Sequence, residues 1–373
     1  MIQPRFTDPD PTSQRIAQLA LTVLNGENLS ADQALQLTQL QNHHLYDLFY
    51  WANRIRIHFL GNAVKFCSIV AAKAGACSED CGFCSQSAKH QTHVAFSKLS
   101  VDEINSAFEQ ARQNGASSFG IVNSGRGPTN KELDWLEPFF KQAASQGQVR
   151  PCATLGELTP EQAQRLKNMG VLRVNHNLET SRKNFPNIIH THTYDHRLQT
   201  LRTAKQAGLS LCSGGIFGMG ESWQDRIDMA LELRSLQVDV VPINFLNAIP
   251  GTALYGQFPD LTPMQALHIV ALYRFLLPTQ ELKVAGGREK ILRDLQSWIF
   301  FAGASSFMIG NYLTTFGRPA SQDHQMLKDL NLPYVTFDEV EHTADPAAAL
   351  QQAPDLPINL RPTTSTLSLP VVS

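Results

Sequence analysis

The sequence predicts an α/β fold, a (β/α)8 barrel of the TIM type with a helical extension before it and a poorly ordered tail after it. Short apolar runs alternate with amphipathic helical segments from about residue 63 onward, and there are eight such runs. Several helical segments end in glycine, the usual residue just past a helix C-terminus. Eight repeats in about 250 residues suit a closed barrel. A doubly wound open sheet is the alternative, because alternation alone does not prove closure.

The predicted elements begin with the helical extension, residues 1–62, in which residues 11–58 carry apolar side chains at helical spacing and Ser30 is a suitable N-cap. The eight expected strands are at 63–72, 117–124, 148–155, 171–178, 209–218, 238–246, 281–287 and 304–310. Amphipathic segments separate them, for example 100–115, 159–170, 193–208 and 222–236. We therefore assign 63–316 to the barrel, 317–344 to a segment that caps it, and 345–373, rich in Pro, Ala, Thr and Ser, to a flexible tail.

Composition and charge exclude several classes of protein. The chain has 373 residues, of which 43% are hydrophobic and 17% are charged, and its net charge is −2. This balance gives no general attraction to nucleic acid or to an anionic membrane. The first residues lack the apolar run of a secretory signal, and the stretch "WIFFAGASSFMIG" is too short to span a bilayer. We expect a cytoplasmic protein whose six cysteines are thiols or metal ligands rather than disulfides.

Three cysteines lie close together in "GACSEDCGFCSQS", which contains Cys77, Cys81 and Cys84. They occupy a polar loop just after the first expected strand, where there is no core for them to fill. A zinc site would need a fourth ligand, and the sequence offers no second cysteine pair but only His90 and His93 nearby. Three thiolates fit an iron–sulfur cluster better and leave one iron of a four-iron cube open. The loop also follows the carboxyl end of a strand, where barrel enzymes have their active sites.

The spacing C-x3-C-x2-C, with Phe83 before the last cysteine, resembles the signature of the radical S-adenosylmethionine (SAM) enzymes. The stretches "NHNLETS", "HTYDHRLQTL", "CSGGIFGMGES", "VPINFLNAIPGT", "GREKILRDLQ" and "FAGASSFMIGNYLTT" are similar to those of one family in this superfamily, the biotin synthases, from about Leu24 to Asn331. The resemblance implies a [4Fe-4S] cluster whose open iron binds SAM, and a 5′-deoxyadenosyl radical. It also implies insertion of sulfur into dethiobiotin, the sulfur coming from a second, sacrificial iron–sulfur cluster deep in the barrel.

The resemblance also assigns binding residues. It implies that Arg197 binds the SAM carboxylate, that Glu179 holds the ribose hydroxyls and that Asn177 contacts SAM and substrate. Glu179 is one methylene longer than the aspartate usual at this position. No protein acid or base is expected, and we interpret His176 as structural. The expected SAM contacts are Phe83, Asn177, Glu179, Arg197, Gly214, Gly215 and Ile216, and the expected dethiobiotin contacts are Asn177 and Asn244.

The second cluster departs from the family pattern. The best-known members hold a [2Fe-2S] cluster there with three cysteines and one arginine. Cys152 and Cys212 match two of these cysteines. Gly120 stands where the third is expected, and Lys283 stands where the arginine is expected. A lysine lacks the planar guanidinium fork and binds iron only as the neutral amine, against an ordinary pKa of about 10.4.

Cys67, in the first expected strand, is the remaining cysteine. If this strand lines the barrel, its alternate side chains point inward, and Cys67 reaches the same cavity as Cys152 and Cys212. We hypothesise that these three thiolates hold a second cluster of different composition, a four-iron cluster with an extra sulfide. The alternative is that Cys67 is a buried packing residue and that the second cluster is weak or absent.

Two other functions stay open at this point. One is another radical SAM enzyme with a similar barrel, such as the hydrogenase-maturation or methylornithine-forming enzymes. The other is a non-catalytic protein that binds zinc or a cluster. For a biotin synthase, the resemblance implies a small flavodoxin or ferredoxin as electron donor, a homodimer as the assembly, and neither nucleic acid nor membrane as a partner.

Overall fold

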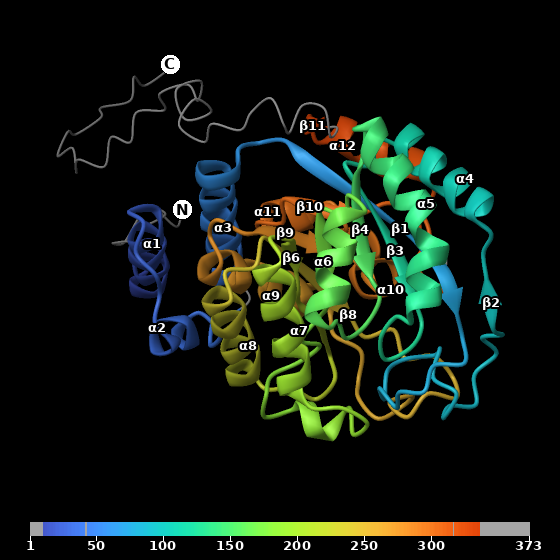
Figure 1. The fold of residues 1–373 in the computed structure, drawn as a ribbon. Coiled ribbons are helices and arrows are strands. Elements are labelled where there is room, and N and C mark those ends of the chain that lie inside the picture. Colours follow the sequence, from blue (N-terminus) through green and yellow to red (C-terminus); the bar gives the residue numbers. More distant parts are fainter. Residues whose placement is uncertain (1–9, 42, 316, 336–373) are drawn as a thin grey trace, which may run out of the picture.

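The computed structural model describes residues 10–41, 43–315 and 317–335, and within these ranges eight parallel strands close into a barrel (Figure 1). The strands follow one another around the barrel in chain order, and the last pair closes it. β10 (Ser306–Met308) runs parallel to β1 (Val64–Ala74), with Lys65 opposite Ser306 and Cys67 opposite Met308. The predicted barrel is confirmed. An open sheet is excluded because its two edges would be the strands that pair here.

The barrel strands coincide with the apolar runs expected from the sequence. The expected run 209–218 is divided into β6 and a short β7 (Gly215–Phe217), which pairs with β8. The sequence does not predict β2 (Ser97–Lys98), antiparallel to the end of β1, or β11 (Tyr334–Val335), parallel to its start. A strand of only two residues shows too little alternation of apolar and polar residues to be predicted. The other barrel strands are β3 (Ser118–Asn123), β4 (Arg150–Thr154), β5 (Arg173–Asn175), β6 (Ser210–Cys212), β8 (Val240–Phe245) and β9 (Glu281–Val284).

Helices surround the barrel, and hydroxyl residues begin many of them. The predicted cap at Ser30 is confirmed, because its hydroxyl accepts the N–H of Gln33 at 3.2 Å and the Gln33 side chain accepts the N–H of Ser30 at 2.9 Å. The same reciprocal cap begins α4 to α9. The helices are α1 (Pro11–Leu24), α2 (Ala31–Gln36), α3 (His44–Leu60), α4 (Val101–Gln113), α5 (Asn130–Gln146), α6 (Pro160–Asn168), α7 (Tyr194–Gln206), α8 (Trp223–Ser235), α9 (Pro263–Leu276), α10 (Arg288–Leu292), α11 (Trp298–Phe301) and α12 (Ala320–Asp329), with 3-10 turns at Phe185–Asn187 and Arg293–Leu295.

The N-terminal extension completes the core of the barrel. Every residue of α9 from Ala266 to Leu276 is buried, and a helix that is buried all round must be covered on all sides. It packs on β9 on one side and on α3 on the other, and Figure 1 shows α3 along this flank of the barrel. Arg274 is buried within α9, and its guanidinium donates to four backbone carbonyls at 2.8–3.0 Å.

The predicted C-terminal segments and the predicted segment boundaries are tested only in part by the structure. The predicted tail, 345–373, lies outside the described residues, and the segment boundaries at 62, 316 and 344 stay predictions. The capping segment 317–344 includes α12 and β11 in its described part. None of the helices in the described ranges is both long enough and apolar enough to cross a membrane.

Candidate active site

The barrel encloses a cavity of about 410 Å³, and both groups of three cysteines line it. We call Cys77, Cys81 and Cys84 the first thiol site, and Cys67, Cys152 and Cys212 the second thiol site. The first site lies in the loop after β1, at the carboxyl end of the strands. The second site lies on β1, β4 and β6 themselves, so it is deeper in the barrel.

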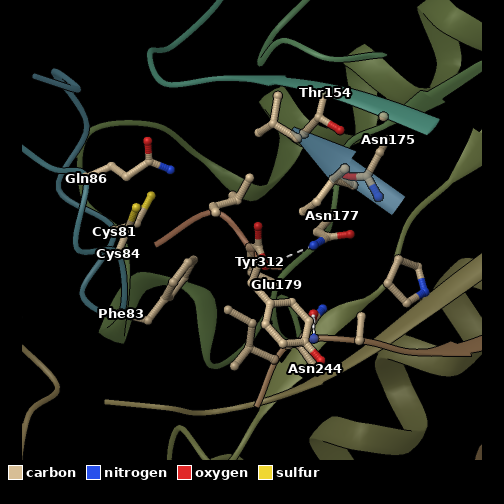
Figure 2. Close-up of a pocket in the computed structure, with 18 of the residues that line it drawn as sticks. Cys81, Phe83, Cys84, Gln86, Thr154, Asn175, Asn177, Glu179, Asn244 and Tyr312 are labelled. Carbon is tan, nitrogen blue, oxygen red and sulfur yellow. Dashed lines mark hydrogen bonds between the residues drawn. The ribbon is translucent and has the colours of Figure 1, made fainter. Parts of the chain in front are cut away.

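Alternate strand residues form the cavity wall, because alternate side chains of a strand point to the same face. On β1 the lining residues are Cys67 and Ile69, and on β4 they are Cys152 and Thr154. Figure 2 shows the region near the loops, with the cysteine loop on one side and the strand residues on the other. The labelled loop residues are Cys81, Phe83, Cys84 and Gln86, and the labelled residues across from them include Thr154, Asn175 and Asn177.

The loop of the first thiol site has a defined backbone conformation. It leaves β1 at Gly75, whose φ of +73° favours glycine and where a Cβ would lie 2.8 Å from the carbonyl oxygen of Ala95. The Cys77 N–H then donates to the Gln86 carbonyl at 3.0 Å, and the Ala88 N–H donates to the Cys77 carbonyl at 2.8 Å. These bonds fold the cysteine motif back on itself.

Two acidic residues inside the motif tie the loop to the segment before α7. The Glu79 carboxylate accepts the Thr191 hydroxyl at 2.7 Å and pairs with the His192 ring at 2.6 Å. The Asp80 carboxylate accepts the N–H groups of His190 and Thr191, both at 3.0 Å. We call these contacts the acidic latch. Sequence analysis missed them, although "SED" between the cysteines and "HTHT" before α7 were the available signals.

Neither thiol site is arranged for a single metal ion. Thiolates on one zinc, with Zn–S distances of about 2.3 Å, lie within about 4 Å of one another. Among the described residues, neither cysteine triplet has all its ligand atoms within 4.8 Å of one another, whereas Asp10, His43 and His44 on the N-terminal extension do. His90, considered above as a zinc ligand, has its Nδ1 2.8 Å from the carbonyl oxygen of Cys84. The wide separation suits a multi-iron cluster.

Burial keeps the thiols of Cys81 and Cys84 protonated until a cation binds. Burial raises the pKa of Cys81 to about 12 and that of Cys84 to about 11. Since thiolates are the form that binds iron, assembly of a cluster must release protons here.

Asn177, Glu179 and Arg197 form one linked group in the cavity wall. Figure 2 shows the first two of them. Arg197 donates to the Asn177 carbonyl at 2.8 Å, and its guanidinium lies 3.5 Å from the Glu179 carboxylate. The Asn177 amide lies 3.5 Å from the other carboxylate oxygen. The structure therefore brings together three of the seven residues that the resemblance assigned to SAM.

Glu179 occupies an unusual backbone position. Its φ is +70°, the left-handed region that side chains other than glycine seldom adopt, and such strain is typical of functional sites. Burial raises the pKa of its carboxyl, while the charge of Arg197 and the hydrogen bond from Asn177 act in the opposite direction.

The glycine-rich stretch after β6 serves strand packing. A Cβ on Gly214 would lie 2.0 Å from the carbonyl oxygen of Pro242, and one on Gly215 would lie 2.6 Å from that of Glu179. Only glycine, which has no Cβ, fits there. Ile216 lines the cavity, whereas the two glycines do not.

Asn244 and Phe83 lie on different walls of the cavity. The Asn244 side chain links neighbouring backbone segments, since its oxygen accepts the Gly286 N–H at 2.9 Å and its nitrogen donates to the Gly215 carbonyl at 3.1 Å. Phe83 projects from the cysteine loop beside Cys84 (Figure 2).

Several buried polar atoms in the wall lack a partner among the described residues. They include both amide atoms of Asn123, Nε2 of His176 and Nε of Arg197. Buried polar groups are normally hydrogen-bonded, so these atoms indicate a polar ligand. Burial lowers the pKa of His176 well below its ordinary value, and the charges of Arg197 and His192 add to this. Asn123 was missed in the sequence, where its place at the end of a strand was the signal.

The loop after β10 adds a further wall that the sequence did not assign. Tyr312 lines the cavity (Figure 2). Its hydroxyl donates to Glu289 at 3.0 Å. The hydroxyl of Thr314 lies 3.1 Å from that of Ser85 in the cysteine loop. This loop therefore joins the two sides of the cavity.

Lys283 contacts two thiols of the second site. Its Nζ lies 3.3 Å from Sγ of Cys67 and 3.7 Å from Sγ of Cys212, and the Asn175 amide lies 3.1 Å from the same Cys212 sulfur. Burial raises the pKa of Cys152 to about 12, against the charges of Arg173 and Lys283. The inward orientation expected for Cys67 is what the structure has.

The position of the missing third cysteine is filled by a neighbour. Gly120 lines the cavity on β3, and a Cβ there would lie 3.1 Å from Cγ2 of Ile69 on β1. The Ile69 side chain thus covers the glycine on the cavity side.

Comparison with known proteins gives a consistent result. The sequence profile of the "Radical SAM superfamily" matches residues 73–233, and that of the "Biotin and Thiamin Synthesis associated domain" matches residues 242–333. The biotin synthase of Geotalea uraniireducens is 48% identical over 319 residues, which cover 85% of this chain and 97% of that protein. That of Heliobacterium modesticaldum is 46% identical over 318 residues, with the same coverage.

Solved structures that share the fold include the following two. A methylornithine synthase superimposes with a TM-score of 0.75 at 16% identity, over 87% of this chain and 99% of its own. The hydrogenase maturase HydG from Carboxydothermus hydrogenoformans has a TM-score of 0.73 at 17% identity, over 86% of this chain and 79% of its own. At such low identity these two likenesses concern the barrel alone.

Proposed function

Because the chain belongs to the biotin synthase family, we propose that the residues of its barrel cavity carry out radical SAM insertion of sulfur. The chain is a radical SAM enzyme that converts dethiobiotin to biotin. The observation that carries this conclusion is the 48% identity to a biotin synthase over 97% of the relative's length.

The first thiol site, Cys77, Cys81 and Cys84, holds the [4Fe-4S] cluster. Its support is the separation of the sulfur atoms, too wide for one ion, and the acidic latch that fixes the loop. When bound, this cluster and SAM supply the 5′-deoxyadenosyl radical that removes hydrogen from the substrate carbons. The protein contributes position and exclusion of water rather than an acid or base.

SAM lies along the linked group of Asn177, Glu179 and Arg197. A guanidinium binds a carboxylate through two parallel hydrogen bonds, and Arg197 still has a buried Nε without a described partner. The Glu179 carboxylate can accept both hydroxyls of a ribose.

Dethiobiotin lies between SAM and the second thiol site, against Asn177 and Asn244. The substrate carries a cyclic urea, which both donates and accepts hydrogen bonds. Side-chain amides match this pattern because they also offer a donor and an acceptor. Both asparagines line the cavity. The segment of Asn177 pairs with Gly215 on one side, through Glu179, and the strand of Asn244, β8, pairs with it on the other.

The second thiol site, Cys67, Cys152 and Cys212, holds the sulfur-donating cluster. Its support is that three thiols and Lys283 share one end of the cavity, with Lys283 in contact with two of the sulfur atoms. In this arrangement Lys283 is a hydrogen-bond donor to sulfur and not an iron ligand. Three protein ligands leave an iron open for an extra sulfide in a four-iron cluster.

The electron donor is a flavodoxin or a ferredoxin, and the enzyme is a homodimer in solution. Both proposals rest on the family. Exposed aromatic side chains at Tyr46, Tyr50 and Phe301, on α3 and α11, offer a surface for association. Sedimentation at several concentrations tests the dimer, and a monomer throughout would exclude it.

One experiment tests the function as a whole. The protein is reconstituted anaerobically with iron and sulfide, and SAM, a low-potential reductant and dethiobiotin are added. Mass spectrometry then measures 5′-deoxyadenosine and biotin. Both products are expected. Deoxyadenosine without biotin or a thiolated intermediate would retain the radical chemistry and refute dethiobiotin as the substrate.

A further inference from the structure

The floor of the cavity holds a second buried cation besides Lys283. Arg173 on β5 lines the cavity, and only 5% of its surface is exposed. In the strand register it lies opposite Cys152 on β4 and Ser210 on β6. Paired residues on neighbouring strands point to the same face, so the guanidinium enters the cavity beside the Cys152 thiol.

Thiols and cations alternate around the barrel at this depth. The strand order runs from β4 through β5, β6, β8, β9 and β10 to β1. Each cation therefore stands between two thiols of the second site, as the contacts of Lys283 with two sulfur atoms illustrate. The resulting order is Cys152, Arg173, Cys212, Lys283 and Cys67.

Arg173 forms no close salt bridge within the described part of the chain. Its Nε donates to the hydroxyl of Ser210 at 3.2 Å, which is a neutral acceptor. The Glu281 carboxylate attracts Arg173, but it also attracts Lys283 and Lys65, whose Nζ lies 3.6 Å from it. A buried guanidinium is always charged, and it is costly unless anions and hydrogen bonds compensate it. Because Glu281 faces three cations, a further anion beside Arg173 would be stabilised here.

We propose that Arg173 positions an anionic sulfur of the second cluster between Cys152 and Cys212, namely an inorganic sulfide bound to iron rather than to the protein. This inference rests on the proposed second cluster. The Ser210 contact holds Nε and leaves the two terminal nitrogens for the sulfide. A planar fork suits this task better than the ammonium of a lysine. Lys283 on β9 replaces the arginine expected there, and Arg173 on β5 thus provides a guanidinium in its place.

The test isolates the second site. Cys77, Cys81 and Cys84 are all replaced by alanine, so that bound iron and sulfide report the second site alone. Three variants are made in this background: Arg173→Gln, Arg173→Lys and, as a matched control, Arg202→Gln at an exposed arginine of α7. After anaerobic reconstitution we measure the sulfide-to-iron ratio, the Mössbauer spectrum and the rate of iron release to a chelator.

Arg173→Gln is expected to release iron about tenfold faster than the background protein, as for other groups that orient metal ligands, and to lower the sulfide-to-iron ratio. In Arg173→Lys, the rate of iron release and the sulfide-to-iron ratio should lie between those of Arg173→Gln and the background protein. Arg202→Gln should change neither quantity. Circular dichroism checks the folding of each variant. If Arg173→Gln does not fold, Arg173→Lys tests the proposal, because loss of the guanidinium must still alter the Mössbauer spectrum of the cluster.

Two results would overturn the inference, and they are distinguishable. Unchanged spectra and iron release within twofold of the background protein in both Arg173 variants would show that the guanidinium does not hold cluster sulfide. A background protein that binds no iron at all would instead refute the proposed second cluster, and the role of Arg173 would fall with it.

Discussion

At the scale of single residues, site side chains are held by backbone groups before any ligand binds. Arg197 donates to the carbonyl of Asn177, and Asn244 bonds to the backbone on both sides. Groups held in this way need little rearrangement when the ligand arrives. Substitutions that keep the shape but change the polar atoms should therefore affect ligand binding more than folding.

Cys67 is the residue whose role the sequence left most open. We expect Cys67→Ala, reconstituted anaerobically, to lose most of the iron and sulfide of the second site and to form 5′-deoxyadenosine but little biotin. The reason is that three thiolates become two. Iron analysis and the product assay check this. A variant with the full iron and sulfide content would make Cys67 a packing residue.

Glu179→Gln tests the buried carboxyl. A carboxyl whose pKa rises on folding stabilises the protein below its ordinary pKa and loses this contribution as pH rises through the folded-state value. Since burial raises the pKa of Glu179, the charge costs stability at neutral pH when no ligand is bound. We expect Glu179→Gln to raise the Tm of the unloaded protein at neutral pH by about 2 °C, on the order of 1 kcal/mol, and to weaken SAM binding about tenfold.

Calorimetry over a pH series and SAM titration measure these effects. The gain in Tm should disappear below the ordinary pKa of glutamic acid, about 4.3, where the carboxyl is protonated in both states. Glu27→Gln, at an exposed glutamate of the loop after α1, is the control. If Glu179→Gln raised the Tm equally below this pH, the effect could not be assigned to ionisation of the carboxyl.

At the scale of elements, the sequence predicted what local pattern determines and missed what distant contacts determine. The eight strands follow from apolar runs, and the capped helix starts follow from residues three positions apart. The acidic latch was missed, because Asp80 and Glu79 bond to residues 111 and 113 positions away. Arg173 was missed for the same reason. Its meaning depends on which thiols the neighbouring strands bring beside it.

The acidic latch should control the stiffness of the cysteine loop. Asp80→Asn leaves the N–H groups of His190 and Thr191 with a neutral acceptor, which we expect to cost about 1–2 kcal/mol of local stability. Hydrogen exchange at these amides should become about tenfold faster, and first-site iron should be lost more readily. Asp102→Asn, at an exposed position in α4, is the control. Unchanged exchange would mean that the backbone bonds of the loop suffice without the carboxylate.

At the scale of the whole molecule, barrel and extension share one core. Closure was the fold property that the sequence left undecided, because it depends on the pairing of β10 with β1, which are the last and first strands of the barrel. The extension was predicted as helical, but its function as the outer cover of α9 becomes visible only when α3 is placed against it.

Leu48→Ala in α3 tests this unity. Leu48 is fully buried, so its truncation should lower the free energy of unfolding by about 2–4 kcal/mol in a single cooperative transition. Tyr50→Ala, at a side chain that is 58% exposed, should change it much less. Two separate thermal transitions would mean that the extension unfolds independently of the barrel.

The depth of the second thiol site has a consequence for the order of events in one catalytic cycle. Cys67 precedes the end of β1, whereas the first site follows it, and both line one cavity. A component that refills the floor from the loop end must pass the level that we propose for SAM and substrate. In this arrangement the components that bind nearest the loops enter last and leave first. We expect sulfur to be replenished only after the products have gone, so that saturating SAM and dethiobiotin protect an exhausted enzyme from repair.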